Sequence, residues 1–170
     1  TDTRYARETQ RIRMFTAIKN DTLNYENIFN AVKIIFKEFN RYLTEAEQDK
    51  LYRTVTTSIA GRISTNIIAS TIAKHVIERT SFTFVVFKGK DSPITALSTL
   101  LLFGGMAERS IRISDKLKSD APEVYELLRH RDYDLLYFLF ADTVQHFVDA
   151  IQSVYSEGKP VFNQIITKFN

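Results

Sequence analysis

The sequence contains no cysteine, and only five of its 170 residues are glycine and three are proline. Without cysteine the chain can form no disulfide, no thiolate zinc site and no Cys-ligated iron–sulfur cluster. The scarcity of glycine and proline argues against turn-rich sandwiches and repetitive β folds. The Gly-rich phosphate loop, the nucleophile elbow, the His-Glu-x-x-His motif and the EF-hand loop are missing as well. We therefore expect a mainly α protein with no metal site and no small-molecule cofactor.

Long apolar runs are also missing. The longest uncharged stretch, residues 92–107, is interrupted by one proline and two glycines, and a second one, residues 63–73, is shorter. Both fall short of the ~20 apolar residues of a membrane-spanning helix. The N-terminus is rich in arginine rather than apolar, so we expect no secretory signal. These features predict a soluble chain of unknown compartment. The absent initiator Met favours one helical domain, residues 1–170, cut from a longer chain.

The residues that are present have a composition typical of a globular protein, with 44% hydrophobic and 25% charged residues. The net charge of +3 conceals an uneven distribution. Residues 1–118 carry 19 basic and 12 acidic side chains, whereas residues 119–157 carry 2 and 8. The two parts can neutralise each other within the fold. A sequence pI of about 9.1 is therefore weak support for nucleic-acid binding.

A helix start is marked by Thr44 and Glu47, which match a capping box. In this motif each side chain bonds the backbone N–H of the other residue. Apolar residues then continue mostly at i+4 or i+5 spacing, so a long helix is predicted over 44–79, with a bend or break at Gly61. We expect this helix to lie at the centre of the fold.

Other segments also have apolar residues at helical spacing or flanking cap residues. The predicted helices are residues 3–19, 23–42, 92–118 with an interruption at Gly104 and Gly105, 119–130, 132–157 with Asp132 as its cap, and 161–169.

One segment, residues 81–87, is β-branched and aromatic with alternating apolar positions, which favours a strand. A strand needs a hydrogen-bonding partner, and residues 110–114 are the other short alternating run. The fold class is therefore a single compact bundle of six to eight helices around the helix over 44–79. A short two-stranded β ribbon is an open addition, since the second run can equally be helical.

The first candidate site is formed by Asp142, His146 and Asp149, which lie at i, i+4 and i+7 of one predicted helix. A carboxylate one turn from an imidazole can orient the ring and raise its pKa, as in acid–base pairs and some metal sites. The sequence supplies no third ligand or second catalytic group. The alternative is a polar, solvated helix face.

The second candidate site is Arg129, His130 and Arg131, in a helix connection beside Asp132 and Asp134. Two guanidiniums next to an imidazole suit a phosphodiester, because arginine stabilises the charge of the transition state while histidine transfers a proton. This chemistry would be that of a metal-independent RNase-type nuclease. The alternative is a helix C-terminus whose basic residues complement the helix dipole.

The third candidate site is the basic first helix, where Arg4, Arg7 and Arg11 recur at helical spacing and Arg13 lies nearby. Such a stripe can bind a phosphate backbone or an anionic membrane surface. Few aromatic residues accompany it, and no nucleic-acid recognition fingerprint is present. The alternative is an outer helix that pairs with acidic residues elsewhere in the fold.

These observations leave three function classes open. The leading hypothesis is a helical binding or effector module that acts through a protein partner, and the composition is compatible with a domain of a bacterial effector or toxin. The second is a membrane-active domain, pore-forming or lipid-binding, in which residues 63–73 and 92–107 form a concealed segment and the basic first helix binds anionic lipid. The third is the RNase-type nuclease at His130.

Overall fold

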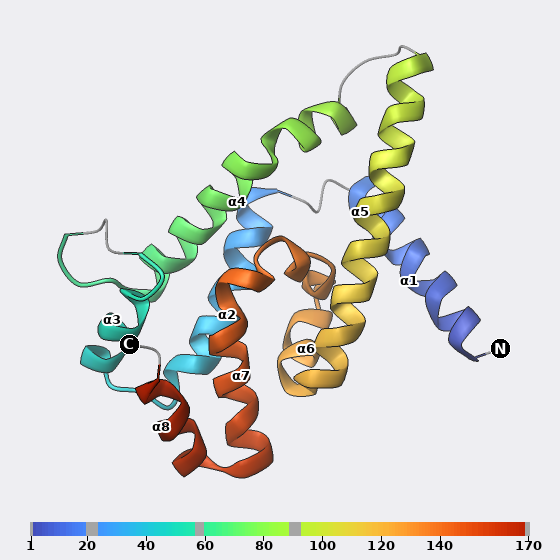
Figure 1. Ribbon diagram of the computed structural model, residues 1–170. Helices are drawn as coiled ribbons and strands as arrows, with labels where there is room; N and C mark the ends of the chain where they lie inside the picture. The colour runs from blue at the N-terminus through green and yellow to red at the C-terminus, as the bar shows by residue number, and fades with distance from the viewer. Residues whose placement is uncertain (1, 20–23, 57–59, 89–92, 169–170) are drawn as a thin grey trace.

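The computed structural model describes residues 2–19, 24–56, 60–88 and 93–168. Over these ranges the chain is mainly helical and contains no strand, which confirms the predicted class (Figure 1). The elements are α1 (Asp2–Lys19), α2 (Tyr25–Asn40), α3 (Glu45–Tyr52), α4 (Thr65–Lys88), α5 (Pro93–Asp120), α6 (Pro122–Arg129), the 3-10 turns η1 (Tyr133–Leu135) and η2 (Tyr137–Leu139), α7 (Ala141–Glu157) and α8 (Lys159–Thr167).

Helix α2 takes the central position, where it packs against α4, α6 and α7 (Figure 1). It begins at a regular cap, since the Asn24 side chain accepts the N–H of Asn27 at 2.8 Å. One face of the helix follows the helical period and is inaccessible to solvent, and its apolar residues are Ile28, Ala31, Val32, Ile35, Phe36 and Phe39. Burial of this continuous face supplies most of the driving force that holds α2 in the bundle.

Aromatic rings from α2, α3, α7 and α8 meet in the core. The Phe147 ring of α7 lies edge-on to Phe36 and Phe39 of α2, with centroids 4.9 and 5.0 Å apart. The ring centroid of Tyr52 on α3 lies 5.1 Å from that of Phe36, and the ring centroid of Phe162 on α8 lies 5.6 Å from that of Phe39. Pairs of this geometry add about 0.5–1.5 kcal/mol to the stabilisation from area burial. The short helices α3 and α8 are attached to the core through these rings.

The predicted long helix over 44–79 is not continuous: the chain forms two helices, and the break expected at Gly61 is confirmed in the loop between them. The capping box at its start is confirmed, with Thr44 and Glu47 bonded reciprocally at 3.0 and 3.2 Å. Helix α3 ends at Tyr52 and α4 begins only at Thr65.

The break has a local and a tertiary cause. Gly61 has a φ of +82°, a left-handed conformation that a right-handed helix cannot contain. Ser64 then caps a new helix, since its hydroxyl accepts the N–H of Ile67 at 3.3 Å. The Asp49 carboxylate accepts the N–H of Ile63 at 2.6 Å, which folds the loop back against α3.

The β ribbon is also wrong, since residues 81–87 belong to α4 and residues 110–114 belong to α5. Ser110 and Ile111 are adjacent and both buried. Neighbouring residues of a strand point to opposite faces, so this pair suits a helix that is packed on several elements. Local β propensity is a weak preference that tertiary packing readily overrides.

Two helix boundaries differ from the prediction. Helix α5 is continuous through Gly104 and Gly105. The helix expected to start at Asp132 starts instead at Ala141, after η1 and η2. Asp132 is not its cap but a turn residue with a φ of +59°, and its carboxylate bonds two arginine side chains. The remaining predicted helices agree with α1, α2, α6 and α8 to within a few residues.

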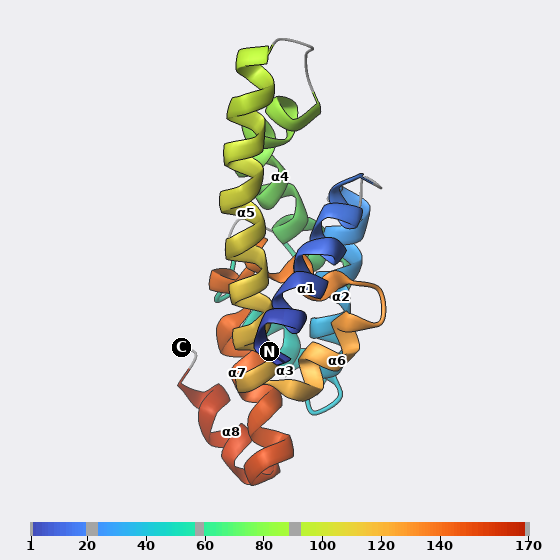
Figure 2. The ribbon, with the colours of Figure 1, turned by 90° about the vertical axis from the view of Figure 1, so that its right-hand side faces the viewer.

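The distal halves of α4 and α5 extend past the rest of the molecule (Figures 1 and 2). On α4 the last described residues packed in the core are Val76 and Ile77, and Arg79 donates a bond to the carbonyl of Leu139 at 2.7 Å. On α5 the first described residue that packs against the core is Met106. We call residues 80–88 and 93–105 the projecting arm.

Candidate functional site

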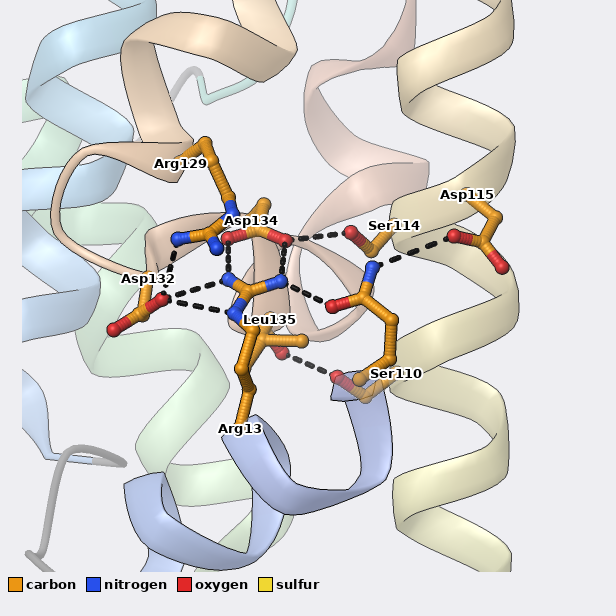
Figure 3. Close-up of polar contacts among 9 residues, drawn as sticks. Arg13, Ser110, Ser114, Asp115, Arg129, Asp132, Asp134 and Leu135 are labelled. Atoms are coloured by element: carbon orange, nitrogen blue, oxygen red, sulfur yellow. Dashed lines mark hydrogen bonds and ion pairs between the residues drawn. The ribbon is translucent and has the colours of Figure 1, made fainter. Parts of the chain in front are cut away.

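An ionic network connects α1 to the turn before α7 (Figure 3). The Arg13 guanidinium donates two hydrogen bonds to Asp134, at 2.7 and 3.2 Å, and two to one oxygen of Asp132, at 2.8 and 3.0 Å. Asp134 is fully buried and also accepts the Ser114 hydroxyl at 2.7 Å. Arg129 bonds the same Asp132 oxygen at 2.9 Å. Basic and acidic parts of the chain neutralise each other here.

Electrostatics keep Arg13 in this network. Burial by itself disfavours the guanidinium charge and lowers the pKa of Arg13. The hydrogen bonds and charge of Asp134, and to a smaller extent those of Asp132, outweigh the effect of burial and raise this pKa. The side chain is 12% exposed. Arg13 therefore attaches α1 to the bundle and does not face an external anion.

The other arginines of the predicted basic stripe are placed differently. Arg4 and Arg7 are exposed on α1. Arg11 lies on the same helix, but its side chain is outside the described part of the structure. Anion binding by this helix stays a prediction for these three residues, and Arg13 takes the alternative role of pairing with acidic residues elsewhere.

The Arg129–His130–Arg131 segment spans the end of α6 and the turn after it. Arg129 is bonded to Asp132, whereas His130 and Arg131 are exposed. Arg129 lies in the last turn of α6, where a positive charge complements the helix dipole. The geometry therefore has the features of the alternative reading, and nuclease activity at His130 stays a prediction.

Asp142, His146 and Asp149 all lie on α7, but they belong to different surroundings. Asp142 lines a hollow with Tyr137, whereas His146 lines another with Phe147. Asp149 accepts the amide of Gln145 at 2.8 Å. Within the described residues no three His, Cys, Asp or Glu side chains are grouped so that they could hold a metal ion.

A basic pocket of about 450 Å³ lies where α2, α3 and the start of α4 meet. Lys33 and Lys37, one turn apart on α2, line it together with Arg62 of the loop before α4. Of the lining residues that the structure describes, Glu45 is the acidic one, and it bonds Arg62 at 2.8 Å. Both side chains of this pair are mostly exposed, at 60% and 79%, so the pair is weak and easily opened.

The two lysines are not neutralised by any acidic side chain in the described ranges. Among the described residues neither Lys33 nor Lys37 forms an ion pair, and the Lys33 ammonium lies 5.8 Å from the centroid of the Phe29 ring. Like charges one turn apart on a helix repel each other. The pocket therefore carries a surplus of two positive charges, three basic side chains against Glu45.

The first turn of α4 adds a partial positive charge. Ser64, Thr65 and Asn66 line the pocket, and this turn contains no acidic residue to complement the helix dipole. The turn is held in place because the Thr65 hydroxyl accepts the amide of Asn40 at 2.6 Å. Helix N-termini flanked by basic side chains suit anions.

Asp49 holds the loop that carries Arg62 into the pocket. Besides accepting the N–H of Ile63, its carboxylate bonds Arg53 at 3.1 Å, and Arg53 in turn donates to the carbonyl of Gly61. The hydrogen bond from the N–H of Ile63 lowers the pKa of Asp49, and the bond and charge of Arg53 lower it further. Burial acts in the opposite direction, but the pKa stays below its ordinary value.

Replacing Asp49 by alanine is expected to accelerate amide exchange of Ile63 by at least ~10-fold, since this N–H loses its acceptor. In the wild type the protection is present at neutral pH, above the ordinary pKa of an aspartate, and is lost as the pH falls through the lowered pKa of Asp49. Amide exchange measured by NMR checks both effects. Glu126→Ala, at an exposed site on α6, is the control, and equal protection in both variants would contradict the assignment.

Sequence reasoning missed this pocket because its basic residues come from separate segments. In the sequence Lys33 and Lys37 lie on the helix predicted over 23–42, whereas Arg62 falls within the separate segment predicted as a helix over 44–79. The available signal is the pair of like charges, Lys33 and Lys37, one turn apart on the same helix. Comparison of the chain with protein-family models, curated proteins and solved structures found no match.

Proposed function

We propose that the chain is a helical binding module that acts through a protein partner, and that the projecting arm is its binding element. The observation that carries this proposal is the extension of α4 and α5 past the core of the molecule (Figures 1 and 2). Apart from α4 and α5 themselves, no described helix lies beside the end of the arm in either view.

The composition of the arm supports the proposal. Residues 81–87 read Ser-Phe-Thr-Phe-Val-Val-Phe, and residues 93–103 contain four leucines, one isoleucine and one phenylalanine. Helices rich in such residues are stable in water when another surface covers them. A partner with an apolar groove for two helices fits these properties.

The membrane-active alternative receives less support. Its first uncharged stretch, residues 63–73, forms the start of α4, where Ile68, Ala69, Ile72 and Ala73 are packed in the core. Releasing this stretch would dismantle the contact between α4 and α2. In the described part of the chain no helix combines the length and hydropathy needed to cross a bilayer.

A photo-crosslinking residue at position Leu100, in the cell that makes the protein, is expected to yield one discrete adduct with a single protein identified by mass spectrometry. The reason is that a bound partner would cover the arm and lie within reach of this position. The same residue placed at Glu157, exposed at the end of α7, is the matched control and should yield no such adduct.

Three outcomes would count against the proposal. Equal adducts from both positions would indicate random collisions. Adducts with lipid alone would favour the membrane-active alternative. If the residue at position Leu100 gave no adduct, the projecting arm would not be a binding element.

A further inference from the structure

We infer that the basic pocket between α2 and the start of α4 is a binding site for a phosphate group. This inference is independent of the projecting arm, because the pocket lies at the opposite end of α4. It rests on the cavity, on two lysines without an ion pair to any described residue and on the loop that holds Arg62 beside them.

The charge of the pocket matches the charge of the ligand. Lys33, Lys37 and Arg62 exceed Glu45 by two positive charges. A phosphate monoester carries about −1.5 to −2 charges at pH 7, whereas a carboxylate carries one. A phosphate therefore neutralises the surplus that the chain itself leaves in place, and it relieves the repulsion between the two lysines.

The donors of the pocket also suit phosphate. Arginine offers a planar fork for two phosphate oxygens, and lysine offers a compact charge. The first turn of α4 adds backbone donors. The Ser64 hydroxyl accepts the N–H of Ile67, and the Ser64 carbonyl accepts the N–H of Ile68. The N–H groups of Thr65 and Asn66 have no acceptor among the described residues. Phosphate binding would draw Arg62 away from Glu45, an exchange that is easy because that pair is exposed.

The pocket is prepared before a ligand arrives. Asp49 fixes the backbone beside Arg62, and Asn40 fixes the Thr65 hydroxyl, while Tyr52 donates to the Asn40 side chain at 2.5 Å. Tyr52 is fully buried and belongs to the aromatic core. Because these supports are part of the fold, binding requires little reordering of the backbone.

Titration of the protein with inorganic phosphate, followed by NMR amide shifts, tests the inference. We expect saturable shifts confined to residues 62–68 and to the α2 positions around Lys33 and Lys37. Potassium chloride at matched ionic strength should not reproduce them. The double variant Lys33→Gln/Lys37→Gln is expected to weaken binding at least ~10-fold, because each lysine contributes a charge-assisted contact.

The matched control is Lys74→Gln, which removes one exposed positive charge farther along α4 and should leave the affinity unchanged. Arg62→Gln provides a second test on the other side of the pocket, with thermal unfolding as a check of its fold. Equal shifts with chloride, equal loss in the control variant or absence of saturation would each overturn the inference.

A parallel titration with O-phosphoserine distinguishes the source of the phosphate. Tighter binding than inorganic phosphate would indicate a phosphorylated side chain as the ligand. Equal or weaker binding would indicate the free ion or a small phosphate ester.

Discussion

Replacing Arg13 by methionine is expected to lower the free energy of unfolding by about 3–5 kcal/mol. The change removes the positive partner of Asp134, whose side chain is fully buried, and among the described side chains it leaves that carboxylate only the Ser114 hydroxyl. An uncompensated charge in the interior is far more costly than a pair that was never formed. Chemical denaturation monitored by circular dichroism measures the effect.

Two variants make the interpretation specific. Lys116→Met breaks the exposed pair with Asp120, at 2.6 Å, and should change stability by less than about 1 kcal/mol. The double variant Arg13→Met/Asp134→Asn should recover part of the loss, since it removes the buried charge as well. If Arg13→Met were as stable as Lys116→Met, the network would not be what attaches α1.

Replacing Phe147 by alanine is the second large effect, with an expected loss of about 3–5 kcal/mol. Phe147 is 2% exposed and its ring contacts both Phe36 and Phe39. Truncation leaves a cavity between α2 and α7 that rigid helices cannot close completely. Differential scanning calorimetry should show a fall in Tm of roughly 10 °C for a chain of this size.

The control for this prediction is Tyr5→Ala on α1, where the ring is 75% exposed. A change within about 0.5 kcal/mol is expected there. Comparable losses in the two variants would mean that Phe147 does not hold the aromatic core together.

The helices that the sequence predicted well are those whose burial follows one period. In the helix predicted over 23–42, apolar residues recur at helical spacing and are fully buried on α2: Ile28, Val32, Ile35, Phe36 and Phe39. On α7 the apolar residues Val144, Phe147 and Ile151 recur at helical spacing and are buried in the same way. Periodicity reports burial directly, because one side of a surface helix faces the core along its whole length.

The long helix over 44–79 failed for a reason that periodicity cannot detect. Apolar residues keep nearly helical spacing across the loop, so nothing local marks its start at Arg53. The bond from Ile63 to Asp49 and the cap at Ser64 decide the break. Such a side-chain contact with a backbone N–H becomes visible only when both ends of the loop are placed.

The prediction of a β ribbon is wrong for the opposite reason, since it depends on a local propensity alone. Residues 81–87 have strong β propensity, yet they continue a helix that is already formed by the packed residues up to Ile77. Adding a residue to an existing helix is far easier than starting a new element.

The sequence by itself determined the helical class, the chemistry that the absence of cysteine excludes and the apolar faces of α2 and α7. Only the tertiary structure decided which charges are used internally. Arg13 pairs with Asp134 across 121 positions of sequence, whereas Lys33 and Lys37 are left beside Arg62 without an ion pair among the described residues. Helical spacing tells which residues share a face, but the neutralisation of a charge depends on which helix that face meets.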